Sequence, residues 1–255
     1  MTVEQLRQLL VTIQAAGLDQ KLAEKNLNFA IFEPYTALTD SILAAWVAFW
    51  AAYLLARANG SRPVMLWGWS FIASAVSSLA GVAFHGSRLV FGMPTAPTEI
   101  VWRIVPIATA VSTLCLGWAA AMVWLRPEKR RMAVALLLLE LVACLGVVLF
   151  GKPKIANDFH LALADSIPVM VVVLIGCFFH WSAPASRWIA AGILTAFIAG
   201  GVQATEWHKG NPPDCNDIFH VIYMAAMYLL YRGGALLPSS SRAEAPAHAA
   251  VLATA

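Results

Sequence analysis

Histidine and carboxylate side chains are the residues of this 255-residue chain best suited to chemistry, and most of them fall near the ends of long apolar runs. Neutral imidazole is the commonest transition-metal ligand among side chains, and a catalytic zinc takes about three protein ligands. Neighbouring carboxylates can orient the imidazoles or act as a general base. Ionisable groups in or beside a membrane segment are costly and therefore mark candidate sites. The pattern points to metal or acid–base chemistry at a membrane boundary.

Seven apolar runs separate these polar residues. Hydrophobic residues make up 60% of the chain and charged residues 12%, and a hydrocarbon core roughly 30 Å thick is crossed by about 20 helical residues. Because backbone groups in lipid must be satisfied internally, each run is predicted to be a helix. The spans are expected at 35–57, 63–86, 99–125, 132–150, 159–181, 185–205 and 216–233. The predicted fold is all-α, a polytopic membrane bundle of seven transmembrane helices.

Three regions are predicted along the chain. Residues 1–30 form an amphipathic N-terminal segment, in which Leu6, Leu9, Leu10 and Ile13 recur at helical spacing among polar residues. Residues 31–235 form the seven-helix membrane domain. Residues 236–255, rich in Ser and Ala, form a disordered C-terminal tail.

Lysine and arginine in the short loops indicate the orientation. The largest group, between the third and fourth runs, is Arg126, Lys129, Arg130 and Arg131. This distribution favours an N-terminus outside and a C-terminus in the cytoplasm, in a bacterial inner membrane. No basic patch interleaved with aromatic residues is present, so a nucleic-acid partner is not expected. The sequence also lacks a CxxC pair, which argues against a cysteine zinc site.

One face of the predicted bundle collects the polar residues, because the starts of odd spans and the ends of even spans lie together. The residues expected there are Glu33, Asp40, His85, Glu99, Asp158, His160, Asp165, Glu206, His208, Asp214, Asn216, Asp217 and His220. Four of the six histidines therefore reach one membrane boundary. His180 falls at the opposite end.

Helix spacing selects among these residues. Residues three or four apart share a helix face, so Asn216, Asp217 and His220 are expected to point into one cavity. Ser78 falls on the helix face of His85. The expected zinc ligands are His85 and His220, with Asp217, His208 or His160 as the third. Asp165 or Glu99 is expected to act as base or orienting residue.

Two further ionisable residues lie deeper in the predicted spans. Arg103 follows Glu99 by four residues, a spacing typical of a helix ion pair. Glu140 falls near the middle of the fourth run, facing either Arg103 or a water-filled cavity. A glutamate at this depth is rare, and a role in a proton path is the functional alternative to a structural one.

The chain resembles the seven-helix superfamily that joins the alkaline ceramidases, the progestin/adipoQ receptors and the Per1 lipid-remodelling proteins. The run EPYTALTD places Glu33 at the acidic residue before the first helix, and the run AGVAFHG places His85 at the histidine that ends the second. Glu99 is the nearest match to the third-helix acid, and NDIFHVIYM places His220 at the second histidine of the seventh-helix pair. The resemblance implies a zinc site that hydrolyses lipid amides.

Two positions depart from the family pattern. Gly81 stands where the family has a serine, and Asn216 stands where it has the first histidine of the seventh helix. The serine would donate to a developing oxyanion, a contribution typically worth about 10²–10³ in rate, and Ser78 or Ser77 from the turn above is the candidate substitute. Two imidazoles alone bind zinc weakly, so a further ligand is required.

Three functional hypotheses follow from the sequence. The first is a membrane-embedded, zinc-dependent hydrolase that cleaves an amide or ester bond of a membrane lipid. The second is a non-catalytic lipid sensor or small-solute transporter, in which Glu140, Arg103 and Asp165 form a polar network. The third is a metal-free membrane cyclase or isomerase that uses Asp217 and Glu206 as acids.

Overall fold

The computed structural model describes residues 34–91, 96–156, 159–207 and 213–238. These residues form helices joined by short turns, and no strand occurs among them. The helices are α3 (Pro34–Arg57), α4 (Arg62–Phe91), α5 (Ala96–Trp124), α6 (Pro127–Phe150), α7 (Pro153–Ala156), α8 (Phe159–Phe179), α9 (Pro184–Ala204) and α10 (Cys215–Ala235). The all-helical prediction is confirmed for this part of the chain. The predicted amphipathic segment lies outside the described residues, as do Glu33, Asp158, His208 and residues 239–255 of the predicted tail.

Six of the described helices are long and apolar enough to cross a membrane. They correspond to Tyr35–Arg57, Arg62–Gly86, Ile100–Trp124, Pro127–Phe150, Phe159–Phe179 and Pro184–Ala204. α10 has 21 residues, as α8 and α9 do, but it is not among the six. Its first turns carry Asn216, Asp217 and His220 and its last turn carries Arg232, which lowers its hydropathy.

Local sequence explains where several helices begin. Pro127 and Pro184 occupy the first turns of α6 and α9, where a missing N–H costs nothing and the fixed φ suits a helix. α6 therefore starts earlier than the predicted boundary at 132 and includes the basic residues 129–131. Between α3 and α4 the chain reverses through Asn59 and Gly60, both at positive φ.

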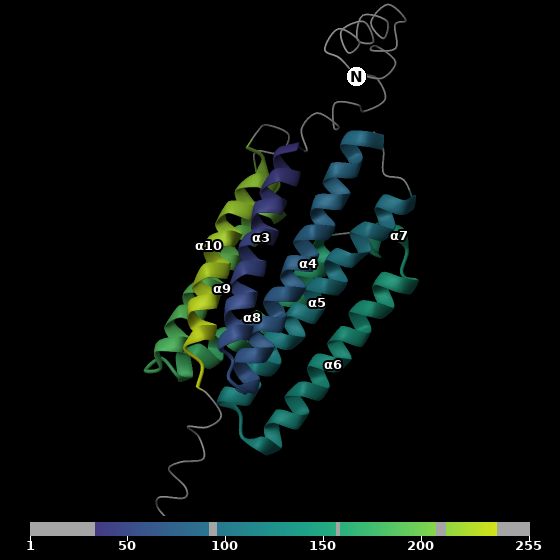
Figure 1. Ribbon diagram of the computed structural model, residues 1–255. Coiled ribbons are helices and arrows are strands. Elements are labelled where there is room, and N and C mark those ends of the chain that lie inside the picture. The colour runs from purple at the N-terminus through teal and green to yellow at the C-terminus, as the bar shows by residue number, and fades with distance from the viewer. Residues whose placement is uncertain (1–33, 92–95, 157–158, 208–212, 239–255) are drawn as a thin grey trace, which may run out of the picture.

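The long helices run side by side, with their connections at the two ends of the bundle (Figure 1). α4 packs between α3 and α5, while α10 packs against both α9 and α3. α6 lies at the edge of the bundle and packs mainly against α5. This arrangement brings the first described helix against the last, so residues from opposite ends of the sequence can meet.

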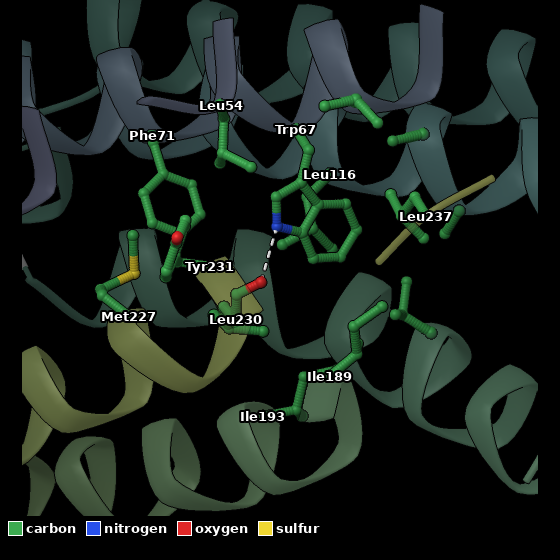
Figure 2. Packing of buried hydrophobic residues seen from close by; sticks show 14 of the residues in the cluster. Leu54, Trp67, Phe71, Leu116, Ile189, Ile193, Met227, Leu230, Tyr231 and Leu237 are labelled. Carbon is green, nitrogen blue, oxygen red and sulfur yellow. Dashed lines mark hydrogen bonds between the residues drawn. The ribbon is translucent and has the colours of Figure 1, made fainter. Parts of the chain in front are cut away.

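An apolar core packs the helices together at the end of the bundle where α3 and α10 end and α4 begins. Trp67 is fully buried and donates its indole N–H to the carbonyl oxygen of Leu230, 3.0 Å away (Figure 2). The glycines of α10 allow this close approach, because a Cβ added at Gly234 would collide with the Trp67 ring and one at Gly233 would collide with Ile189. The opposite end of the same helices carries the polar residues.

Candidate functional site

Asp40, His85 and His220 meet at the polar end of the bundle, from α3, α4 and α10. Nε2 of His220 lies 3.1 Å from Oδ1 of Asp40, and Nε2 of His85 lies 3.9 Å from Oδ2 of the same carboxylate. The side chains are 9%, 12% and 5% exposed for His220, His85 and Asp40. The predicted convergence of the two histidines is therefore present, with the Asp40 carboxylate between them.

Thr39 contacts the second ring nitrogen of His220. Its hydroxyl donates its single proton to the carbonyl oxygen of Thr36, 3.0 Å away, while the hydroxyl oxygen lies 2.8 Å from Nδ1 of His220. With its proton directed to Thr36, the Thr39 oxygen is placed to accept from an Nδ1–H group of His220. In that neutral tautomer Nε2 is an acceptor that faces Asp40 Oδ1, whereas in the other tautomer Nε2–H donates to this oxygen. In the first tautomer, a proton or a metal cation between the two atoms relieves the repulsion.

The second oxygen of Asp40 also lacks a protein donor. Oδ2 is buried and accepts no hydrogen bond within the described part of the chain. Gly81 makes room for it, because a Cβ at that position would lie 2.6 Å from Oδ2 and 3.0 Å from Cγ. The absence of a side chain at Gly81, a departure from the family pattern, thus allows the carboxylate to reach His85.

The three side chains offer donors of the kind that hold a catalytic zinc. Two imidazoles and one carboxylate are such a donor set, and two ligands of a tetrahedral zinc lie about 3.4 Å apart when each is about 2.0–2.2 Å from the ion. The separations of 3.1 and 3.9 Å bracket this value. Over the described ranges, however, no three His, Cys, Asp or Glu residues are already arranged to hold an ion. The donors fit a metal, but the side chains would have to adjust around it.

Asp217, an expected third ligand, is held by hydrogen bonds at the start of α10. Asp214 accepts from the backbone N–H groups of Asn216 and Asp217, and Asp217 accepts in return from the backbone N–H of Asp214, at 3.0 Å. Its other oxygen accepts from the hydroxyl of Thr36, at 3.2 Å. This reciprocal capping satisfies free N–H groups of the helix end. Asp217 therefore positions α10, and through it His220, against α3.

Asp40, His85 and His220 line one end of a cavity of about 510 Å³. The cavity extends between α4, α5, α8, α9 and α10, and most of its lining is apolar. Gln203 donates to Asn216 Oδ1 at 2.6 Å, and both amides border the cavity. The acceptor oxygen of Gln203 is buried with no hydrogen-bond partner in the described chain. The cavity thus offers an apolar interior, a His–Asp cluster and an available amide acceptor.

A set of hydroxyl groups follows the α4–α5 side of the cavity. Ser112 lies 3.0 Å from Ser70 and 2.9 Å from Ser74, oxygen to oxygen. Ser77 lies 3.3 Å from the hydroxyl of Thr109. Ser78, the expected replacement for the family serine, also lines the cavity close to Gly81 and His85.

The other predicted residues do not join the His–Asp cluster. Asp165 is buried, but it does not line the cavity; it contacts Thr113 and lies near Glu140 of α6. His160 and Glu206 are exposed. Glu99 belongs to the first turns of α5, and its side chain lies outside the described residues, so its expected role stays a prediction.

Sequence reasoning did not single out Thr39, Gln203 or Trp102. The ring of Trp102 lies edge-on to that of His85, with 6.0 Å between the ring centroids. It included Asp40 among the polar candidates without giving it a role. No signal in the sequence could have found these partners, because each contact joins different helices and depends on how the helices pack.

Comparison with protein families gives one match, to a family of unknown function, DUF6962, over residues 35–238. The chain belongs to the DUF6962 family. The DUF6962 region contains Asp40, His85 and His220 together with the whole described cavity. No curated protein and no solved structure matches the chain.

Proposed function

We propose that this DUF6962 protein is a membrane-embedded, metal-dependent hydrolase that cleaves an amide or ester bond of a membrane lipid. The observation that carries the proposal is the convergence of His220 Nε2, His85 Nε2 and the Asp40 carboxylate in a nearly buried site, with 3.1 and 3.9 Å between the ring nitrogens and the carboxylate oxygens. Asp40 Oδ2 has no donor within the described chain. A cation stabilises this arrangement.

His85, His220 and Asp40 would hold the metal, and zinc suits imidazole and carboxylate donors. A bound zinc would supply Lewis-acid polarisation of the substrate carbonyl and activation of water. Asp40 contributes the negative charge that favours a cation, and Thr39 is placed to hold the ring of His220 in the tautomer that leaves Nε2 free to coordinate. Such orienting hydrogen bonds are a regular part of metal sites.

The rest of the cavity supports a lipid substrate. An apolar interior excludes water and accepts a hydrocarbon chain. Ser78, which lines the cavity, presents a hydroxyl group for a developing oxyanion, and the unpaired oxygen of Gln203 accepts a hydrogen bond from the polar part of the substrate. We therefore place the scissile bond beside His85 and the acyl chain further into the cavity.

The proposal includes seven membrane crossings. α10, antiparallel to α9 and as long, is the seventh, and its polar first turns lie at the membrane boundary beside Asp40 and His85. The loop charges favour an extracytoplasmic location for this end. The likeness to the ceramidase, progestin/adipoQ receptor and Per1 superfamily supports the same arrangement.

The metal-free cyclase or isomerase has less support. It requires Asp217 and Glu206 as acids, but Asp217 is held by the α10 cap and by Thr36, and Glu206 is exposed. The two carboxyl groups therefore do not offer a shared acid site in the cavity.

Elemental analysis of detergent-purified protein tests the proposal. We expect about one equivalent of zinc per chain, retained in His180→Ala and lost in the His85→Ala/His220→Ala double variant. His180 is the matched control because it lies at the opposite end of the bundle, against Trp124. Release of fatty acid from a lipid amide or ester should disappear with the metal. A double variant that keeps stoichiometric zinc, or a folded wild type that binds none, would contradict the assignment.

A further inference from the structure

A second large cavity shares no lining residue with the one beside the His–Asp cluster. It is a groove of about 720 Å³ between α5, α6 and α8. Leu136 and Leu139 of α6 and Val172 of α8 line it and are 59%, 64% and 68% exposed, so the groove opens on the surface that faces lipid. α6 lies at the edge of the bundle (Figure 1) and packs mainly against α5.

Small residues form the floor of the groove. A Cβ added at Gly117 would lie 2.9 Å from Val169, and one at Gly176 would lie 2.7 Å from the ring of Trp124. α5 and α8 therefore approach closely behind the groove. Trp124 stacks on His180 at one end, with 5.7 Å between ring centroids and 14° between ring planes. The groove is thus bounded by packed helices and rings.

Glu140 is the one carboxylate among the residues that line the groove. Its partly buried side chain lies in the middle of the α6 span, and the lining includes no lysine or arginine. Arg103, an expected partner of Glu140, does not line the groove. Arg130, on the first turn of α6, donates instead to the backbone carbonyls of Met122 and Leu125, at 3.0 and 3.3 Å. A carboxylate at this depth is costly and calls for a positive partner.

A second carboxyl group, that of Asp165, lies near Glu140 without lining the groove. Its Oδ2 is buried with no hydrogen-bond partner in the described chain. Trp124 and Phe179 present aromatic rings to the groove, and ring faces attract organic cations. The groove therefore combines an apolar surface, aromatic rings and a carboxyl group with no lysine or arginine in the lining.

We propose that the α5–α6–α8 groove binds a lipophilic organic cation, with its positive charge at Glu140 and its apolar groups against Leu136, Val172 and Trp124. A neutral lipid chain would fill the groove without compensating Glu140, and an anion would be repelled. This site is separate from the His–Asp cluster and does not depend on zinc.

Titration of detergent-purified full-length protein with tetraphenylphosphonium tests the proposal. We expect saturable binding that quenches tryptophan fluorescence, and no displacement by tetraphenylborate, an anion of matched size and shape. Glu140→Gln should weaken binding by about tenfold or more, equivalent to about 1.4 kcal/mol, whereas Glu140→Asp should keep part of the affinity. Glu128→Gln, at the exposed start of α6, is the matched charge control and should bind as wild type.

A second pair of variants leaves the carboxylate in place. Ala143→Trp puts a large side chain into the groove and should abolish binding, while Ala135→Trp, on the exposed side of α6 outside the groove, should not. The His85→Ala/His220→Ala variant should bind tetraphenylphosphonium normally. Thermal melting confirms that each variant is folded. No binding to wild type, equal binding by folded Glu140→Gln, or equal binding of tetraphenylborate would overturn the proposal.

Discussion

The imidazole of His220 on α10 lies 3.1 Å from the carboxylate of Asp40 on α3, so residues from the last and first described helices form one contact. Thr39, the neighbour of Asp40, binds the other nitrogen of the same ring at 2.8 Å. Two adjacent residues of α3 thereby hold both nitrogens of His220. This relationship ties the geometry of the His–Asp cluster to the packing of α3 against α10.

Thr39→Val should weaken zinc binding without unfolding the protein. The substitution keeps the shape of the side chain but removes the oxygen that accepts from His220 Nδ1, so the ring is no longer held in the coordinating tautomer. Loss of such a partner typically lowers metal affinity by about 10–100-fold. Competition with a chelator measures the affinity. Thr39→Ser, which keeps the hydroxyl, should restore it; equal affinities for Thr39→Val and wild type would remove Thr39 from the site.

Gly81→Ala should displace the Asp40 carboxylate. The new methyl group would lie 2.6 Å from Oδ2, and overpacking of this kind typically costs about 1–3 kcal/mol of stability. We expect a lower melting temperature and loss of bound zinc. Gly86→Ala is the matched control on the same helix, since nothing lies within 4 Å of a Cβ there.

A double variant tests whether Gly81→Ala destabilises the protein through its clash with the Asp40 carboxylate. In an Asp40→Ala background the carboxylate is absent, so Gly81→Ala should cost markedly less stability than it does in wild type. The two substitutions should therefore be non-additive, as expected for residues in contact. Additive costs would mean that Gly81 is required for a reason other than room for Asp40.

Asp214→Ala should destabilise the start of α10. Asp214 accepts from the backbone N–H groups of Asn216 and Asp217, at 2.9 and 3.2 Å, and removal of such a cap typically costs about 0.5–2 kcal/mol. Thermal melting should show the loss, and Asp214→Asn or Asp214→Ser should recover much of it. Because His220 lies on the next turn, zinc affinity should fall in parallel. An Asp214→Ala variant with the melting temperature and zinc affinity of the wild type would contradict this role of Asp214.

Gly233→Ala should disrupt the packing of α9 against α10. A Cβ at Gly233 would collide with the Ile189 side chain and lie 3.1 Å from the backbone nitrogen of Ile189 and 3.2 Å from the carbonyl oxygen of Ala185. Backbone atoms cannot rotate away as side chains can, so the helices must separate. We expect a lower melting temperature or loss of folded protein in detergent. Gly201→Ala, with nothing within 4 Å of its Cβ, should melt as wild type does.

The sequence by itself was sufficient to predict the helices and to indicate a membrane protein. Apolar runs of bilayer length must be helical because lipid offers no partners for backbone N–H and C=O groups. The alternation of those runs was also sufficient to predict that His85 and His220 share one end of the bundle. Boundaries were less well predicted where proline starts a helix within a basic segment, as at Pro127.

Only the tertiary structure decided which polar residues touch. The sequence favoured Asp217 or His208 beside the two histidines, whereas the carboxylate that reaches both is Asp40, in the space that Gly81 leaves. Asp165, expected near the cluster, instead contacts Thr113 and lies near Glu140. Helical spacing fixes the relative directions of residues on one helix, but the rotation of each helix about its axis depends on how all its neighbours pack.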